Sequence, residues 1–166
     1  MIPNLKHFAG WRLWGLVAIL LSVNGCGGTD AAFTLTNATV DASHACSSGA
    51  SNSPYDLHAT IDSHNGTSSS ISIKTVSAVM TLAAVHGGWL QQVGYRYDAG
   101  SVVFAPDQVG AGSSATLKVT VTSACTNHSK TGGPLSYGDY SVALTVGTSA
   151  GTFKIESRNR HRLIAS

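Results

Sequence analysis

The sequence predicts an all-β domain built as an antiparallel sandwich, preceded by an N-terminal signal-peptide helix. Apolar and polar residues alternate in several short segments, as they do in half-buried strands. Clusters of Gly, Asn, Ser and Pro separate these segments and are typical of turns. About seven to nine short strands with little helix favour a sandwich.

The domain is expected to begin with two strands. Phe33, Leu35 and Val40 mark the first strand. A polar loop over residues 47–54 follows it. Residues 55–62 then alternate strictly between apolar and polar, which predicts a strand with one buried face.

The middle of the chain is expected to add three strands after the strong turn signal Asn65-Gly66. Residues 71–85 are mostly apolar, and the spacing in the second half would also fit a short helix. Strands with a bulge or a bend are preferred because β-branched side chains dominate. Residues 89–97 and residues 102–104 are the other two candidates.

The last third of the domain has the clearest pattern. Residues 115–122 and 140–146 each alternate between apolar and polar side chains. A polar loop over residues 126–136 separates them. A turn at residues 148–151 leads into the strand over residues 152–156, which is predicted to be the last.

The first 25 residues have the order of a targeting segment. Lys6 and Arg12 precede the apolar run 13–21. This run fits the apolar region of a signal peptide, about 7–15 residues, and is shorter than the roughly 20 residues of a spanning helix. The sequence Val23-Asn24-Gly25-Cys26 follows and resembles the lipobox of bacterial lipoproteins. That resemblance implies cleavage before Cys26 and acylation of the new N-terminal residue by diacylglycerol and palmitate-type chains.

The same resemblance divides the chain into three parts. Residues 1–25 are the lipoprotein signal peptide, residues 26–32 a lipidated tether, and residues 33–166 the β-sandwich domain. It implies a location in the cell envelope, with the domain facing the periplasm or the exterior. Since Gly27 follows the cysteine, the outer membrane is expected in a Gram-negative cell.

The charge balance argues against nucleic acid as a partner. Of the ten Lys and Arg residues, only Lys6 and Arg12 precede Cys26, whereas all eight Asp and Glu residues follow it. The mature part is therefore formally neutral and has no broad basic field.

Three cysteines occur in the chain, and an odd number in an exported protein calls for an explanation. Lipidation of Cys26 leaves Cys46 and Cys125, which we expect to form a disulfide in an oxidising compartment. The alternative is two free thiols or metal ligands. Neither has a neighbouring Cys at the spacing of zinc ligands, so a thiolate zinc site is not expected.

Gly138-Asp139-Tyr140 precedes an alternating strand and resembles the tyrosine corner of immunoglobulin-like domains. The resemblance implies that the Tyr140 hydroxyl bonds to nearby backbone. Cys125 precedes Tyr140 instead of following it by two residues, and no Trp stands in the usual place. The sandwich is thus immunoglobulin-like in the broad sense, with its bridge near strand ends.

Histidine is the most notable titratable residue type. Asp56, His58, Thr60, Asp62 and His64 share one face of the second strand by their period of two. Such side chains can bind zinc or copper, but a solvated polar face is the simpler interpretation. No metal site and no cofactor are predicted.

Catalysis is not expected. No Gly-x-Ser-x-Gly sequence stands before a helix, and the chain has a single Glu, Glu156. The basic cluster 158–162 is interpreted as a solvated strand end, with contact to anionic lipid as the alternative.

Trp89, Tyr95, Arg96 and Tyr97 form the best candidate contact surface, because aromatic residues and Arg are favoured at recognition sites. The alternative is that Trp89 and one Tyr belong to the core.

The sequence thus predicts a membrane-anchored exported lipoprotein, acting as a non-catalytic binding or envelope-structural module. Its expected partners are the membrane, through the lipid, and an envelope protein or glycan. The alternatives are an accessory subunit of an envelope complex, a metal or small-ligand carrier using surface histidines, and a hydrolase.

Overall fold

The computed structural model describes residues 32–47, 49–99, 102–126 and 136–165. The targeting segment and Cys26 lie outside these ranges. The described residues form strands and turns but no helix, and thus no helix that could cross a bilayer.

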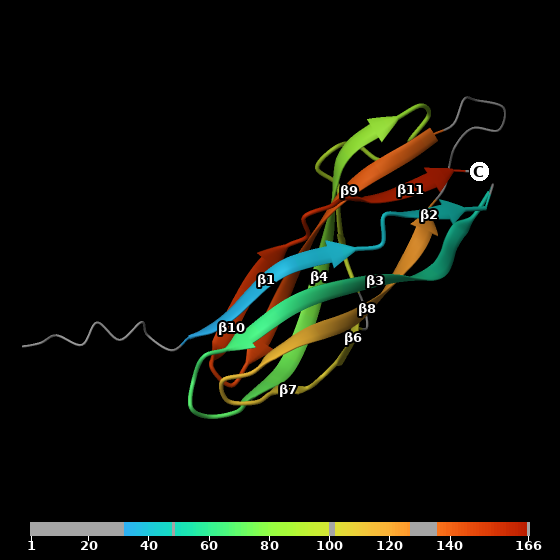
Figure 1. Cartoon of the computed structure of the whole chain (residues 1–166). Helices are drawn as coiled ribbons and strands as arrows, with labels where there is room; N and C mark the ends of the chain where they lie inside the picture. Colours follow the sequence, from blue (N-terminus) through green and yellow to red (C-terminus); the bar gives the residue numbers. More distant parts are fainter. Residues whose placement is uncertain (1–31, 48, 100–101, 127–135, 166) are drawn as a thin grey trace, which may run out of the picture.

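The described residues form two sheets (Figure 1). The smaller sheet has four strands, all antiparallel, in the order β1-β3-β8-β6. Their bounds are Phe33–Val40 for β1, Ser51–Asn65 for β3, Ser114–Thr126 for β8 and Val102–Ala105 for β6.

The larger sheet has seven strands, five of them in the order β2-β11-β9-β4-β5. β10 also pairs with β9, and β7 with β4. Their bounds are Ser43–Cys46 (β2), Ile71–His86 (β4), Arg96–Asp98 (β5), Gln108–Val109 (β7), Ser136–Thr148 (β9), Gly151–Glu156 (β10) and His161–Ala165 (β11).

The predicted fold class, an immunoglobulin-like β-sandwich, is confirmed. Two details of the sandwich differ from the expectation. The pair β2–β11 is parallel, whereas the other pairs are antiparallel. The described residues also contain eleven strands instead of seven to nine, and the four longest have 13–16 residues each.

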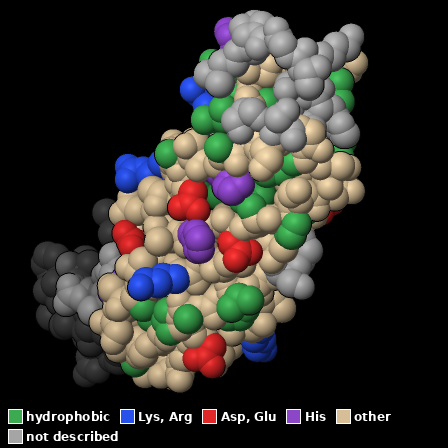
Figure 2. All heavy atoms as spheres, turned by 90° about the vertical axis from the view of Figure 1, so that its right-hand side faces the viewer, with side chains coloured by type: hydrophobic (Ala, Val, Ile, Leu, Met, Phe, Trp, Pro, Cys, Tyr) green, Lys and Arg blue, Asp and Glu red, His purple; other side chains and the backbone are tan. Residues whose placement is uncertain are grey.

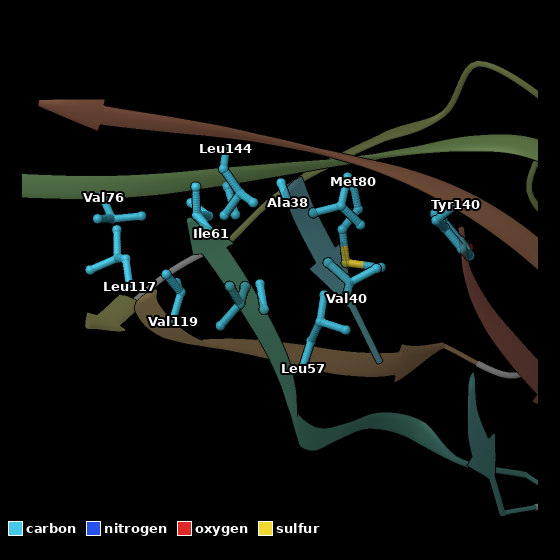
Figure 3. Close-up of a cluster of buried hydrophobic side chains, with 14 of the residues drawn as sticks. Ala38, Val40, Leu57, Ile61, Val76, Met80, Leu117, Val119, Tyr140 and Leu144 are labelled. Atoms are coloured by element: carbon cyan, nitrogen blue, oxygen red, sulfur yellow. The ribbon is translucent and has the colours of Figure 1, made fainter. Parts of the chain in front are cut away.

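The core lies between the sheets, where the inward residues of the alternating strands meet (Figure 3). Leu57 and Ile61 of β3, Leu117 of β8 and Leu144 of β9 all belong to this core, and all four are completely buried. The alternation predicted for these strands is therefore confirmed. Burial of one such side chain contributes roughly 1.5–3 kcal/mol.

A bulge in β1 explains why its apolar residues do not follow one period. Its register against β3 shifts between Thr36 and Thr39, and Asn37 has a φ of 52°. Phe33 lies inward before the bulge, and Val40 lies inward after it. The extra residue resets which side chains face the core.

The long apolar segment forms one strand, β4, which confirms the expected strand with a bulge. Its register against β9 shifts between Ile73 and Thr75 and again between Leu82 and Ala84. β-branched residues favour this extended backbone.

An asparagine side chain closes the outer edge of β1. The Nδ2 atom of Asn159 donates to the carbonyl of Val40 at 2.7 Å, and its Oδ1 atom accepts from the Val40 amide at 3.0 Å. The amide of Arg158 donates to the carbonyl of Ala38 at 2.8 Å. The turn after β10 therefore occupies hydrogen-bonding positions that a further strand would use.

The disulfide joins Cys46, the last residue of β2, to Cys125 near the end of β8. It connects the two sheets at one end of the sandwich, as expected for a bridge near strand ends. Both cysteines are buried.

Two strand predictions were wrong. Residues 89–97 were expected to form a strand, but only Arg96–Asp98 does so, and residues 87–95 form a loop. The strand ending at Glu156 was expected to be the last, whereas β11 follows it and lies between β2 and β9 in the larger sheet.

Candidate functional site

The loop over residues 87–95 connects β4 to β5 and carries most of the exposed apolar surface. Among the described residues, four of the five exposed large apolar side chains lie between positions 85 and 95. Leu90, Val93 and Tyr95, which line one shallow hollow, are 56%, 59% and 48% exposed. We call these three residues the apolar patch.

The backbone fixes this loop against β4. The amide of Gly94 donates to the carbonyl of Leu82 at 2.8 Å, and the amide of Leu82 donates to the carbonyl of Tyr95 at 2.9 Å. Gly94 has a φ of 93°, a conformation that a side chain would strain. The loop therefore presents its apolar side chains from an ordered backbone.

The four residues predicted as the contact surface divide between surface and core. Tyr95 and Arg96 are exposed, whereas Trp89 and Tyr97 are half-buried and pack against the core. The alternative interpretation, with Trp89 and one Tyr in the core, therefore describes these residues correctly.

Trp89 packs directly on a glycine of β9. A Cβ atom added to Gly138 would lie 2.8 Å from Cε2 and 2.9 Å from Nε1 of the Trp89 ring. This close approach is possible only because residue 138 has no side chain. The indole thereby holds the loop onto the larger sheet.

A cavity of about 130 Å³ opens beside the patch, at the same end of the sandwich as Tyr140 in Figure 3. Its floor contains the core residue Met80. The remaining lining comes from both sheets and the loop, namely Asn52, Gln91, Tyr95, Tyr97, Ser123, Ala124, Tyr140 and Leu163. These nine described lining residues are all of uncharged types.

Tyr140 links the loop to β9 through its hydroxyl, which donates to Oε1 of Gln91 at 2.6 Å. Burial raises the pKa of Tyr140 to about 12, so this hydroxyl stays protonated. A tyrosine corner would use nearby backbone as the acceptor, whereas Tyr140 bonds to a side chain 49 positions earlier. Its function here is to position the 87–95 loop.

The predicted histidine face lies on the outer side of β3. His58 Nδ1 is 2.9 Å from Oδ2 of Asp41, and His64 Nδ1 is 3.0 Å from the hydroxyl of Ser114. Asp62 accepts hydrogen bonds from the side chains of Asn37 and Thr116. Each group thus has its own neighbour, and no three potential metal ligands cluster within the described ranges.

The His58–Asp41 pair fixes the turn between β1 and β2. Burial alone would raise the pKa of Asp41, but hydrogen bonds from the backbone and ring of His58 lower it further than burial raises it. Both side chains are well exposed, so the pair contributes little to stability.

A second histidine site is buried between β3 and β11. His161 Nδ1 lies 2.7 Å from the carbonyl oxygen of Asp41, which can only accept, so this nitrogen carries the proton. The Tyr55 hydroxyl then donates to Nε2 at 3.1 Å. Burial lowers the pKa of His161 and raises that of Tyr55 to about 12, so both are neutral at neutral pH. The ring of His44 stacks on that of Tyr55, with the ring centroids 4.1 Å apart.

The basic cluster of residues 158–162 does not form a continuous patch. Arg158 donates to Oδ1 of Asn37, and Arg162 makes two hydrogen bonds to Asp139 while its guanidinium lies 3.9 Å from the ring of Tyr137. In the view of Figure 2, acidic, basic and histidine side chains are interspersed among uncharged polar groups. That face presents no field of a single charge.

Sequence reasoning missed Leu90, Val93 and the polar lining residues Asn52 and Gln91. Leu90 and Val93 flank Gln91-Gln92, and such isolated apolar residues give no periodic signal. The doublet Gly87-Gly88 and Gly94 are loop signals, but they were not weighed against the strand predicted over residues 89–97.

The chain matches no protein-family model and no curated protein sequence. Among solved structures, it is similar to AggA, the major subunit of aggregative adherence fimbriae type I from Escherichia coli. That similarity has 9% identity and a TM-score of 0.33, and covers 81% of this chain and 96% of AggA.

The CooA pilin subunit of enterotoxigenic Escherichia coli gives 13% identity and a TM-score of 0.30, over 79% of this chain and 98% of CooA. A family 123 glycoside hydrolase from Clostridium perfringens gives 9% identity and a TM-score of 0.36, over 80% of this chain and 27% of the hydrolase. At these scores the similarities carry no argument about function, which has to come from the residues of the site.

Proposed function

We propose that this chain is a non-catalytic binding module of the bacterial cell envelope, anchored by lipid on Cys26, that contacts an envelope protein through the apolar patch. The observation that carries the proposal is the exposure of Leu90, Val93 and Tyr95 on one ordered loop. Exposed apolar side chains that adjoin each other mark contact sites more often than isolated ones do.

The anchor rests on the N-terminal sequence. Basic residues, an apolar run and Val23-Asn24-Gly25-Cys26 follow one another in the order that a lipoprotein signal requires. One acyl chain gives only marginal attachment, whereas two or more on one cysteine hold a protein stably on a membrane. The Cys46–Cys125 bridge fits this assignment, because it leaves Cys26 as the remaining cysteine of the chain.

The fold would place the apolar patch far from such an anchor. β1 begins at Phe33, which pairs with Asn65 at the end of β3. β4 starts near this end at Ile71 and runs for 16 residues, about 50 Å, before the 87–95 loop begins. Figure 1 shows the loop region at the opposite end of the molecule from the start of β1. A lipidated chain would therefore present the patch away from the bilayer.

The apolar patch suits a protein partner. Gln91 and Gln92 lie between Leu90 and Val93 and line the same hollow, so polar and apolar side chains adjoin there, as they do in protein interfaces. Tyr95 adds an aromatic ring with a polar tip, a residue type enriched at binding hot spots.

The test is site-specific photocrosslinking in cells that produce the full chain. A photoreactive amino acid at Gln92 should give a discrete adduct with an envelope protein, and the double variant L90D/V93D should abolish it. Val103, which is 70% exposed on β6, supplies the matched control, and V103D should leave the adduct unchanged. An adduct that persists in L90D/V93D would refute the proposal.

A further inference from the structure

We propose that the cavity beside the apolar patch is a binding pocket for one uncharged aromatic ring, supplied by a Phe or Tyr side chain of the partner. This inference deepens the proposed function, because the ring would anchor the same partner. The binding of a free ring tests the pocket separately from the docking of a protein.

The volume of the cavity limits the size of the side chain that can bind in it. An apolar cavity of about 150 Å³ binds benzene in another protein, and the cavity here measures about 130 Å³. One six-membered ring fits this space, whereas a chain of linked rings does not.

The lack of charge in the described lining favours an uncharged ligand. Among the described residues, no carboxylate and no cationic side chain lines the cavity, and the sulfur of Met80 and the side chain of Leu163 provide apolar surface. A charged ligand would lose its hydration without gaining an opposite charge, which is costly.

The hydrogen bonds of the wall favour an aromatic ring over a sugar. The Tyr140 hydroxyl already donates to Gln91, and the Ser123 hydroxyl donates to the sulfur of Met80 at 3.7 Å. A monosaccharide carries several hydroxyls, each of which needs a partner when buried. An aromatic ring needs few, and Tyr95 and Tyr97 at the wall offer ring surfaces for offset or edge contacts.

The pocket is formed before binding. The Tyr140–Gln91 hydrogen bond and the backbone bonds between Leu82 and residues 94–95 hold the loop wall in place. A ring can therefore bind without the entropy cost of ordering the wall.

The experiment uses the single methionine of the pocket. Met1 and Met80 are the two methionines of the chain, so methyl-labelled methionine gives a nuclear magnetic resonance signal from the cavity floor, which M80L assigns. Titration of the full chain with benzyl alcohol should shift the Met80 signal saturably, with a Kd on the order of 1 mM. Benzoate, of similar size but charged, should bind at least about tenfold more weakly.

Two tyrosine variants distinguish the loss of a wall of the pocket from the general effect of removing a tyrosine. Y97A removes part of the wall and should weaken benzyl alcohol binding about fivefold or more. Y137A removes a half-buried tyrosine that stacks on His86, outside the cavity, and should leave binding unchanged.

The inference is overturned if benzyl alcohol leaves the Met80 signal unmoved, or if benzoate or N-acetylglucosamine binds as tightly as benzyl alcohol. It is also overturned if Y137A weakens binding as much as Y97A does. The Gln92 crosslink, in contrast, can fail while benzyl alcohol still binds, and that result would refute only the protein partner.

Discussion

Loss of the Cys46–Cys125 bridge should destabilise the domain strongly. The bridge closes a loop of 79 residues, and the chain-entropy model gives about 4.5 kcal/mol at 25 °C for a loop of this length. A change of this size corresponds to a fall in Tm of about 15–20 °C for a domain of this size. Because both cysteines are buried and small, alanine at each position removes the bridge with little loss of packing.

The measurement compares two unlipidated chains by thermal and urea unfolding. C26A keeps the bridge, and C26A/C46A/C125A lacks it, so the pair differs at the bridge alone. A difference in unfolding free energy below about 1 kcal/mol would refute the reasoning, since it would mean that the long loop is already restrained in the unfolded chain.

Three further predictions each concern a single residue. G138A should displace the Trp89 ring and lower the free energy of unfolding by about 1–3 kcal/mol through overpacking. Urea unfolding measures the loss of stability and tryptophan emission reports the displacement, so an unchanged emission spectrum would contradict the prediction. Burial lowers the pKa of His161 in the folded state, so on acidification this imidazole is protonated first in the unfolded chain. The contribution of His161 to stability is therefore full above pH 6.5 and is lost as the pH falls from 6.5 towards the folded-state pKa. H161N should flatten this slope in denaturant titrations at several pH values, and an unaltered slope would exclude His161 as its source. C26S should move the protein from the membrane to the soluble fraction after cell fractionation, and continued sedimentation with membranes would count against the lipid anchor.

The alternating strands could be predicted from the sequence because their burial follows a period of two. Leu57 and Ile61, like Leu117 and Leu144, face the core as expected. The pattern failed where the backbone departs from that period. In β1 the bulge at Asn37 changes the inward set, and no local sequence signal indicated it.

β11 was missed because its residues look like a polar tail. His161 and Arg162 suggest exposure, but His161 is buried through its hydrogen bonds to Tyr55 and the backbone of Asp41. Those partners lie more than 100 positions away, so only the tertiary fold reveals why this histidine can enter the core.

The candidate site was located only coarsely from the sequence. The aromatic residues near Arg96 pointed to the correct segment, yet the exposed residues Leu90 and Val93 were not identified. Loop side chains have no periodicity, so their exposure depends on how the loop packs. Here Trp89 packs on Gly138, whereas Leu90 and Val93 of the same loop lie exposed.

The side chain of Asn159 has a consequence for the behaviour of the protein at high concentration. An unpaired sheet edge is a template on which other chains can add strands and start aggregates. By satisfying both backbone groups of Val40, the Asn159 amide stops such intermolecular sheet growth at this position of β1. At high concentration this margin of the sandwich is thereby kept from joining neighbouring copies.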